Sequence, residues 1–107
     1  MEITINARHL TLPDSLRNQV TQRLTRMQRL NRRITGGTIV FDIERGIRRA
    51  EARLAVAGGP PLLGHGKGPT LRAAMDGALE RLERQLKRRH DRMIARRTKG
   101  VRRLIAP

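Results

Sequence analysis

Cysteine, tryptophan and tyrosine are absent from this sequence of 107 residues, and Phe41 is its one aromatic residue. Without cysteine the chain can form neither a disulfide framework nor a thiolate metal site. The shortage of aromatic side chains argues against a protein that stacks exposed bases on an aromatic platform. No apolar run approaches the roughly 18 residues of a membrane span. The first residues show no signal-peptide pattern, so we expect a cytoplasmic protein.

Acidic residues are also scarce: nine Asp and Glu stand against 24 Lys and Arg, which gives a net charge of +15. The whole excess lies in two segments. Residues 17–33 hold six arginines and no acid, and residues 84–103 hold ten basic residues and one acid, Asp91. Such clustering is typical of a surface that binds a polyanion. Arginine dominates, which favours phosphate as the ligand, although a GC-rich genome also enriches arginine.

Two amphipathic helices are predicted. The first covers about residues 12–31, and Thr11 and Asp14 have the spacing of a capping box at its start. Its apolar side chains recur at helical spacing: Leu16, Val20, Leu24, Met27 and Leu30. Thr70 can cap the second helix, which we expect to end near Arg97. Its apolar stripe is Leu71, Met75, Ala78, Leu79, Leu82 and Leu86. Beyond this stripe the helix is mostly charged and should project into solvent or onto a partner.

Four short strands complete the pattern, at residues 2–6, 38–44, 50–56 and 62–66. The fourth is the least well specified, because glycines occupy positions 64, 66 and 68. We therefore predict an α+β fold of order βαβββα, with both helices packed on one face of a four-stranded mixed sheet. The first two strands should be parallel. Gly77, inside the second helix, predicts close packing there. Residues 1–97 would form a single domain, and residues 98–107 a basic flexible tail.

Catalytic and metal-binding constellations are not evident in the sequence. His9, His65 and His90 have no carboxylate or second histidine at ligand spacing. The glycine-rich segment 64–68 lacks the spacing of a phosphate-binding loop. Asp76 stands alone, so we expect it to make a structural hydrogen bond rather than act as a base. We therefore predict no enzyme activity, no metal and no cofactor.

Several short motifs resemble the hibernation-promoting factor family, whose members include the ribosome-associated inhibitor A and were once named sigma-54 modulation proteins. The resemblance covers about residues 1–93. Its carriers are Leu16-Arg17, Val20-Thr21, the turn at Gly58-Gly59, the run Ala73-Ala74-Met75-Asp76-Gly77 and the basic run from Arg88 to Arg92. Their order and spacing, together with the βαβββα plan, carry the resemblance.

The resemblance implies a protein that binds the small ribosomal subunit in vacant ribosomes, in the channel of mRNA and tRNA. It would inhibit translation by steric occupancy, and it would be a short form of the family. Apart from the resemblance, we expect the protein to be a monomer. The basic helix faces would contact rRNA through Arg17, Arg23, Arg26, Arg29, Arg84, Lys87, Arg88, Arg89, Arg92 and Arg96. Two alternatives remain open. The basic runs could be solvated helix faces, or the protein could bind double-stranded RNA and other polyanions without preference for the ribosome.

Overall fold

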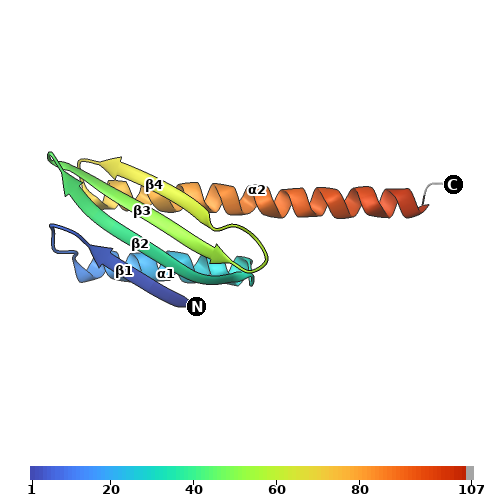
Figure 1. Cartoon of the computed structure of the whole chain (residues 1–107), viewed down its shortest axis with the longest axis horizontal. Coiled ribbons are helices and arrows are strands. Elements are labelled where there is room, and N and C mark those ends of the chain that lie inside the picture. Colours follow the sequence, from blue (N-terminus) through green and yellow to red (C-terminus); the bar gives the residue numbers. More distant parts are fainter. Residues whose placement is uncertain (106–107) are drawn as a thin grey trace.

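A computed structural model describes the backbone of residues 1–105 and the side chains of residues 1–92 (Figure 1). The elements are β1 (Glu2–Ala7), α1 (Asp14–Leu30), β2 (Ile34–Glu44), β3 (Ile47–Val56), β4 (Leu62–Gly68) and α2 (Leu71–Ile105). This confirms the α+β class and the βαβββα order predicted from the sequence. The molecule is elongated, 63 × 25 × 20 Å, because α2 continues far beyond the sheet.

The four strands form one mixed sheet in the order β1-β2-β3-β4. β1 and β2 are parallel, as predicted, and the two other pairs are antiparallel. The turn between β2 and β3 consists of Arg45 and Gly46, whose φ angles are 51° and 79°. A two-residue hairpin turn with positive φ at both positions matches the right-handed twist of its strands. Local turn chemistry thus fixes the register of the longest strand pair.

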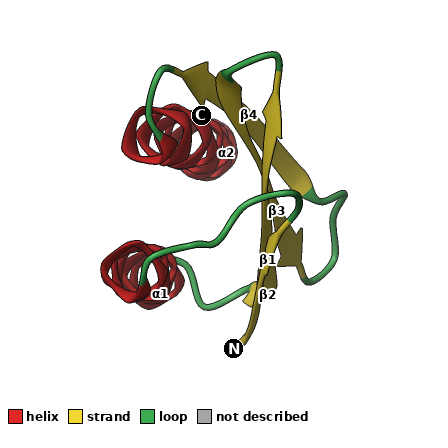
Figure 2. Cartoon of the chain, turned by 90° about the vertical axis from the view of Figure 1, so that its left-hand side faces the viewer, coloured by secondary structure: helices red, strands yellow, loops and turns green. Residues whose placement is uncertain are grey.

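Both helices cover the same face of the sheet, which confirms the predicted packing (Figure 2). The apolar stripes of the helices and the inward side chains of the strands form one cluster, in which Phe41 is the largest fully buried side chain. Full burial of a side chain of this size stabilises the fold by about 1.5–3 kcal/mol. Within the described residues no polar or charged residue is buried in this core. The sheet therefore has one dry face and one wet face.

Glycines in β4 allow α2 to pack unusually close to this strand. A Cβ atom on Gly64 would collide with the carbonyl oxygen of Ala78, and one on Gly66 with that of Ala74. On the helix side, a Cβ on Gly77 would lie 3.2 Å from the Cα of Gly66. The predicted close packing at Gly77 is confirmed. The glycines that weaken the strand pattern are required by the approach of the helix, and β4 extends beyond the predicted residue 66 to Gly68.

The predicted capping box at Thr11 does not form. α1 begins at Asp14 after Pro13, which is extended, with φ −61° and ψ 144°, and makes no side-chain cap. The residue before a proline is disfavoured in helical conformation. Leu12 therefore stays outside the helix, and its side chain packs into the core. At α2 the prediction is confirmed, because the hydroxyl oxygen of Thr70 accepts a hydrogen bond of 3.1 Å from the backbone N–H of Ala73.

Two further predictions about the helices are wrong. The helical spacing predicts that Leu30 belongs to the apolar stripe of α1 that packs on the sheet, but 77% of its surface is exposed. It is the last residue of α1, where a cavity separates this helix from α2. The second helix was expected to end near Arg97, but α2 continues to Ile105. The flexibility of residues 98–107 stays a prediction, and residues 106–107 lie outside the described part.

Candidate nucleic-acid interface

Three of the predicted arginines on α1 are exposed: Arg17, Arg26 and Arg29. The buried stripe of α1 occupies the side of the helix that faces the sheet, so these arginines point elsewhere. Among residues 1–92, no carboxylate lies within ion-pair distance of any of the three. Their charge is available to an external anion.

Arg23, the fourth predicted residue on α1, lies in a different environment. Its guanidinium donates to Oδ1 of Asp76 at 2.8 Å and to Oε1 of Glu83 at 3.2 Å. Only 24% of its side chain is exposed, and both acids belong to α2. Arg23 therefore links the two helices, with its charge compensated inside the fold. The structural hydrogen bond expected of Asp76 is this contact.

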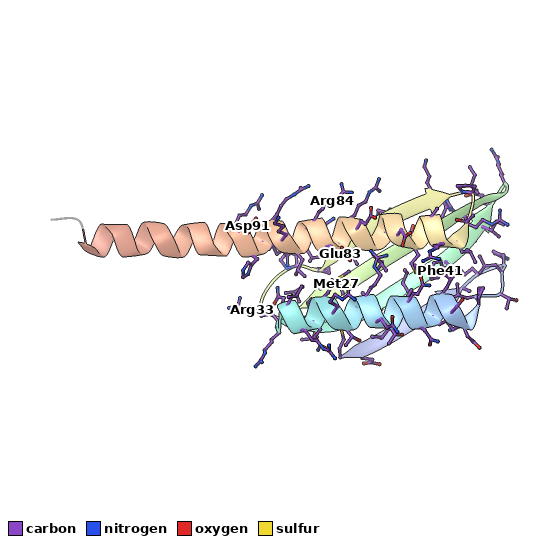
Figure 3. The ribbon with its side chains drawn as sticks, turned by 180° about the vertical axis from the view of Figure 1, so that it is seen from behind. Met27, Arg33, Phe41, Glu83, Arg84 and Asp91 are labelled. Carbon is purple, nitrogen blue, oxygen red and sulfur yellow. The ribbon has the colours of Figure 1, made fainter. Side chains whose placement is uncertain are left out.

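On α2, four of the predicted residues are exposed: Arg84, Lys87, Arg88 and Arg92. Arg84, Arg88 and Arg92 follow each other at intervals of four residues and share one face of the helix. In Figure 3 Arg84 points away from α1. Arg84 also lies 3.8 Å from the carboxylate of Glu80, an exposed pair that contributes little to stability. The side chain of Arg96 lies outside the described part of the chain.

Arg89 is half-buried and belongs to a row of side chains that donate from α2 to the strand beside it. Arg81 donates to the carbonyl oxygen of His65 at 2.7 Å, Gln85 to that of Leu63 at 2.6 Å, and Arg89 to that of Pro60 at 2.8 Å. These carbonyls lie along the open edge of β4 and the loop before it. The row satisfies acceptors that would otherwise be free to pair with another strand. Arg81 and Gln85 were not singled out in the sequence, although the spacing 81, 85, 89 marks one helix face.

The two basic segments converge at the end of α1, beside the point where α2 leaves the sheet. A hollow of about 540 Å³ lies there between the end of α1 and the loop from β3 to β4. Its basic lining comes from both segments: Arg32 and Arg33 from the first, and Arg89 and Arg92 from the second. Figure 3 shows Arg33 beyond the end of α1. Neither Arg32 nor Arg33 is among the RNA-contacting residues that the sequence predicts. Both residues lie in the connection between α1 and β2, and the path of this connection places them in the hollow.

The wet face of the sheet has a different charge pattern. Arg49 pairs there with Asp42 at 3.0 Å and with Glu44 at 2.8 Å, and His65 lies 3.8 Å from Glu51. The backbone N–H of Ile43 and the guanidinium of Arg49 lower the pKa of Asp42, because both stabilise its charged form. Asp42, Glu44 and Glu51 thus all take part in cross-strand pairs, and the charge of Arg49 is neutralised within the fold.

In the described part of the chain, no group of three or more His, Asp or Glu residues is placed to hold a metal ion. The three histidines belong to a loop, to β4 and to α2. No helix in the described part is both long and apolar enough to cross a membrane.

Comparison with known proteins decides the family. Residues 3–94 match the family described as sigma 54 modulation protein / S30EA ribosomal protein. The chain belongs to this family. The match agrees with the resemblance noted in the sequence and covers every element of the fold except Glu2 of β1 and the end of α2.

Relatives with known names or structures support the family assignment. The ribosome hibernation promoting factor of Azotobacter vinelandii is 28% identical over 96 residues, which cover 90% of this chain and 89% of that protein. The N-terminal domain of Protein Y from Thermus thermophilus is 30% identical, with a TM-score of 0.73 over 82% of this chain and 98% of that one. A ribosomal subunit interface protein from Coxiella burnetii, 20% identical, shares the fold with a TM-score of 0.76 over 85% of this chain and 99% of that chain.

Proposed function

We propose that this protein is a ribosome hibernation factor. It binds the small ribosomal subunit of vacant ribosomes, in the channel that mRNA and tRNA use, and it inhibits translation by occupying that channel. Family membership supports this proposal, as do the name of the relative in Azotobacter vinelandii and that of the subunit interface protein. The protein would act in the cytoplasm as a monomer, by binding and without catalysis.

The convergence of the two basic segments carries the proposal. Residues 17–33 and 84–103 are far apart in the sequence, yet Arg32 and Arg33 from one and Arg89 and Arg92 from the other line one hollow. Their like charges repel each other, and a bound polyanion would relieve this repulsion. Arginine forks suit phosphate oxygens, so the RNA backbone is the natural ligand.

The mechanism would be steric, with shape providing the specificity. The molecule is rod-like and presents its cations along two parallel helices. Such a shape fits a channel walled by RNA backbone better than it fits a flat RNA surface. Binding through phosphates would depend steeply on salt. With roughly 6–10 phosphates neutralised, the affinity would fall on the order of 10³–10⁵-fold between about 50 and 200 mM salt.

Sedimentation of the purified protein with vacant ribosomes and with separated subunits tests the proposal. We expect the protein to sediment with the small subunit and with vacant ribosomes. Prior occupation of the channel by mRNA and tRNA should release it. Equal binding to both subunits, unaffected by mRNA and tRNA, would contradict the proposed site.

A general binder of double-stranded RNA is the second candidate. The exposed arginines on α1 and α2 suit phosphate contacts in any duplex, which favours this alternative. Competition separates the two functions. A general binder would be removed from ribosomes by free duplex RNA at an equal phosphate concentration, whereas a channel-specific protein would require a large excess.

A further inference from the structure

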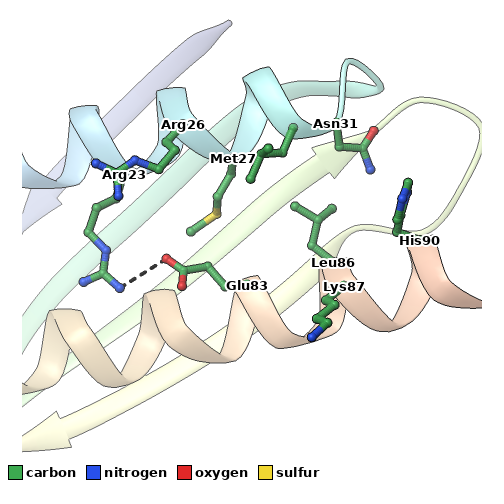
Figure 4. A pocket seen from close by; sticks show the side chains of 9 residues that line it. Arg23, Arg26, Met27, Asn31, Glu83, Leu86, Lys87 and His90 are labelled. Carbon is green, nitrogen blue, oxygen red and sulfur yellow. Dashed lines mark hydrogen bonds and ion pairs between the residues drawn. The ribbon is translucent and has the colours of Figure 1, made fainter.

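A groove between the two helices is not explained by phosphate binding alone. Its volume is about 430 Å³, and it lies between the last turns of α1 and the middle of α2 (Figure 4). Met27 and Leu86 point into it from opposite sides. Leu30 also lines it and is 77% exposed, the most exposed large apolar side chain among the described residues. The groove thus has an apolar interior that nothing in the described part of the chain covers.

The rim of the groove is cationic. Arg26 on α1 and Lys87 on α2 line it together with the apolar residues. The acid in the lining, Glu83, already accepts a hydrogen bond from Arg23 through Oε1. Charge complementarity therefore favours an occupant that combines an apolar body with negative charge at its edges. The volume is within the range of about 300–1,000 Å³ that small-ligand sites occupy.

The groove also adjoins the basic hollow. Leu30, Asn31 and His90 line both cavities. A strand of nucleic acid that follows the cations of the hollow would therefore pass the mouth of the groove. A nucleotide has the required chemistry, with a flat apolar ring face and a phosphate on either side of it.

We propose that this groove receives an unpaired nucleobase of the bound RNA, while Arg26 and Lys87 hold the flanking phosphates. The inference rests on the proposed function and names the part of the RNA that this site recognises. Aliphatic and thioether side chains can contact the faces of a base in place of aromatic rings. Leu30 would supply this contact, and Met27, which is buried, lies in the groove wall beneath it, in a protein that has a single, buried aromatic residue.

Polar groups beside the groove can contact the edge of the base. Oδ1 of Asn31 accepts a hydrogen bond of 3.0 Å from the backbone N–H of Arg33, which orients the side chain and leaves its NH₂ group as a donor. The second carboxylate oxygen of Glu83 can accept from an exocyclic amino group.

The methyl resonances of the methionines in the full chain test the proposal. The probes are a single-stranded RNA hexanucleotide and a ribose-phosphate strand of the same length without bases. We expect the ε-methyl signal of Met27 to shift upfield through the ring current with the RNA but not with the abasic strand. Met75, which is 1% exposed in the core, should keep its position. Equal shifts with both strands would overturn the proposal, as would a Met27 signal that moves only with an acidic peptide.

Ribosome binding by a pair of matched variants provides the second test. Leu30→Ser removes an apolar wall without changing charge, and we expect it to weaken small-subunit binding about five- to tenfold. Leu63→Ser is its control, because Leu63 is 51% exposed on the wet face of the sheet. Equal binding by both variants would overturn the base-binding groove and leave the proposed function intact. If the unmodified protein itself does not bind the small subunit, the proposed function is refuted instead.

Discussion

The two halves of α2 that have described side chains differ sharply in charge and in burial. Residues 71–86 contain three basic and three acidic residues, and Ala74, Met75, Ala78, Leu79, Leu82 and Leu86 are buried there. Residues 87–92 contain four basic residues, one histidine and one acid, and Arg89 is their one half-buried side chain. The first half follows β4 along the sheet, and the second lies at and beyond its end.

From this difference we infer that folding and binding depend on separate parts of one continuous helix. A charge near the sheet must be balanced, because desolvation makes an unpaired charge costly. At the end of the sheet this constraint is lifted, and unbalanced cations are tolerated in solvent. Substitutions in the first half should therefore change stability, and substitutions in the second half should change binding.

The largest expected effect comes from charge reversal in the second half. Lys87, Arg88 and Arg92 are exposed and make no hydrogen bond or ion pair with the rest of the described chain, so their replacement by Glu should leave the fold intact. We expect the triple variant to bind the small subunit on the order of a thousandfold more weakly, because repulsion from phosphate replaces attraction. Equilibrium sedimentation binding and a thermal melt measure the two properties separately.

A matched variant controls for the total change in charge. Arg8, Arg53 and Lys67 are exposed and lie away from both basic helix segments, and replacing them with Glu changes the net charge equally. We expect this control to lose far less affinity than the first variant. Equal losses would show that net charge alone drives association, which would favour the general polyanion binder.

Next in size is the effect of a methyl group at Gly66, in the strand that supports the first half of α2. The new Cβ would collide with the carbonyl oxygen of Ala74, a backbone atom that cannot move without shifting the helix. We expect Gly66→Ala to lower the free energy of unfolding by about 2–3 kcal/mol. Gly59→Ala is the control, because its Cβ would meet the flexible end of Arg89 at 3.5 Å. Urea denaturation compares them, and similar midpoints would refute the close approach of α2 to β4.

A smaller effect should separate Arg23 from Arg26, which are neighbours on α1. Arg23→Gln removes both contacts to Asp76 and Glu83, and we expect a loss of about 1 kcal/mol of stability, because these pairs are partly exposed to solvent. Arg26→Gln should leave stability unchanged and reduce the salt dependence of binding by about one counterion. A larger binding defect in Arg23→Gln than in Arg26→Gln, at a temperature where both are folded, would contradict these roles.

The sequence predicted the fold well because its signals are periodic and local. The stripe from Leu16 to Met27 and the alternation around Phe41 each determine which side of an element is buried. The candidate site was harder to predict from the sequence, because charge clustering identifies a basic segment but not the partner of each residue. Arg23 and Arg26 look alike in the sequence, and only the position of α2 shows that Arg23 faces Asp76. Leu30 fits the helical stripe equally well, yet it lies where no second element covers it.

The smallest expected effect lies on the wet face of the sheet, where charge is balanced as in the first half of α2. Arg49 and the backbone N–H of Ile43 lower the pKa of Asp42 in the folded protein, so the charged carboxylate stabilises the fold. This contribution is fully present above the pKa of the unfolded state, near pH 4, and is lost as the pH falls through the lower folded value. Asp42→Asn should therefore be less stable than the unmodified protein at neutral pH, and the two should converge in acid. Urea titrations between about pH 2 and pH 7 measure this convergence.

Ribosome binding by Asp42→Asn at neutral pH should not change, because this carboxylate lies on the wet face of the sheet, away from the two basic helix segments. A binding defect in this variant would extend the interface onto the sheet and break the division between balanced and unbalanced charge.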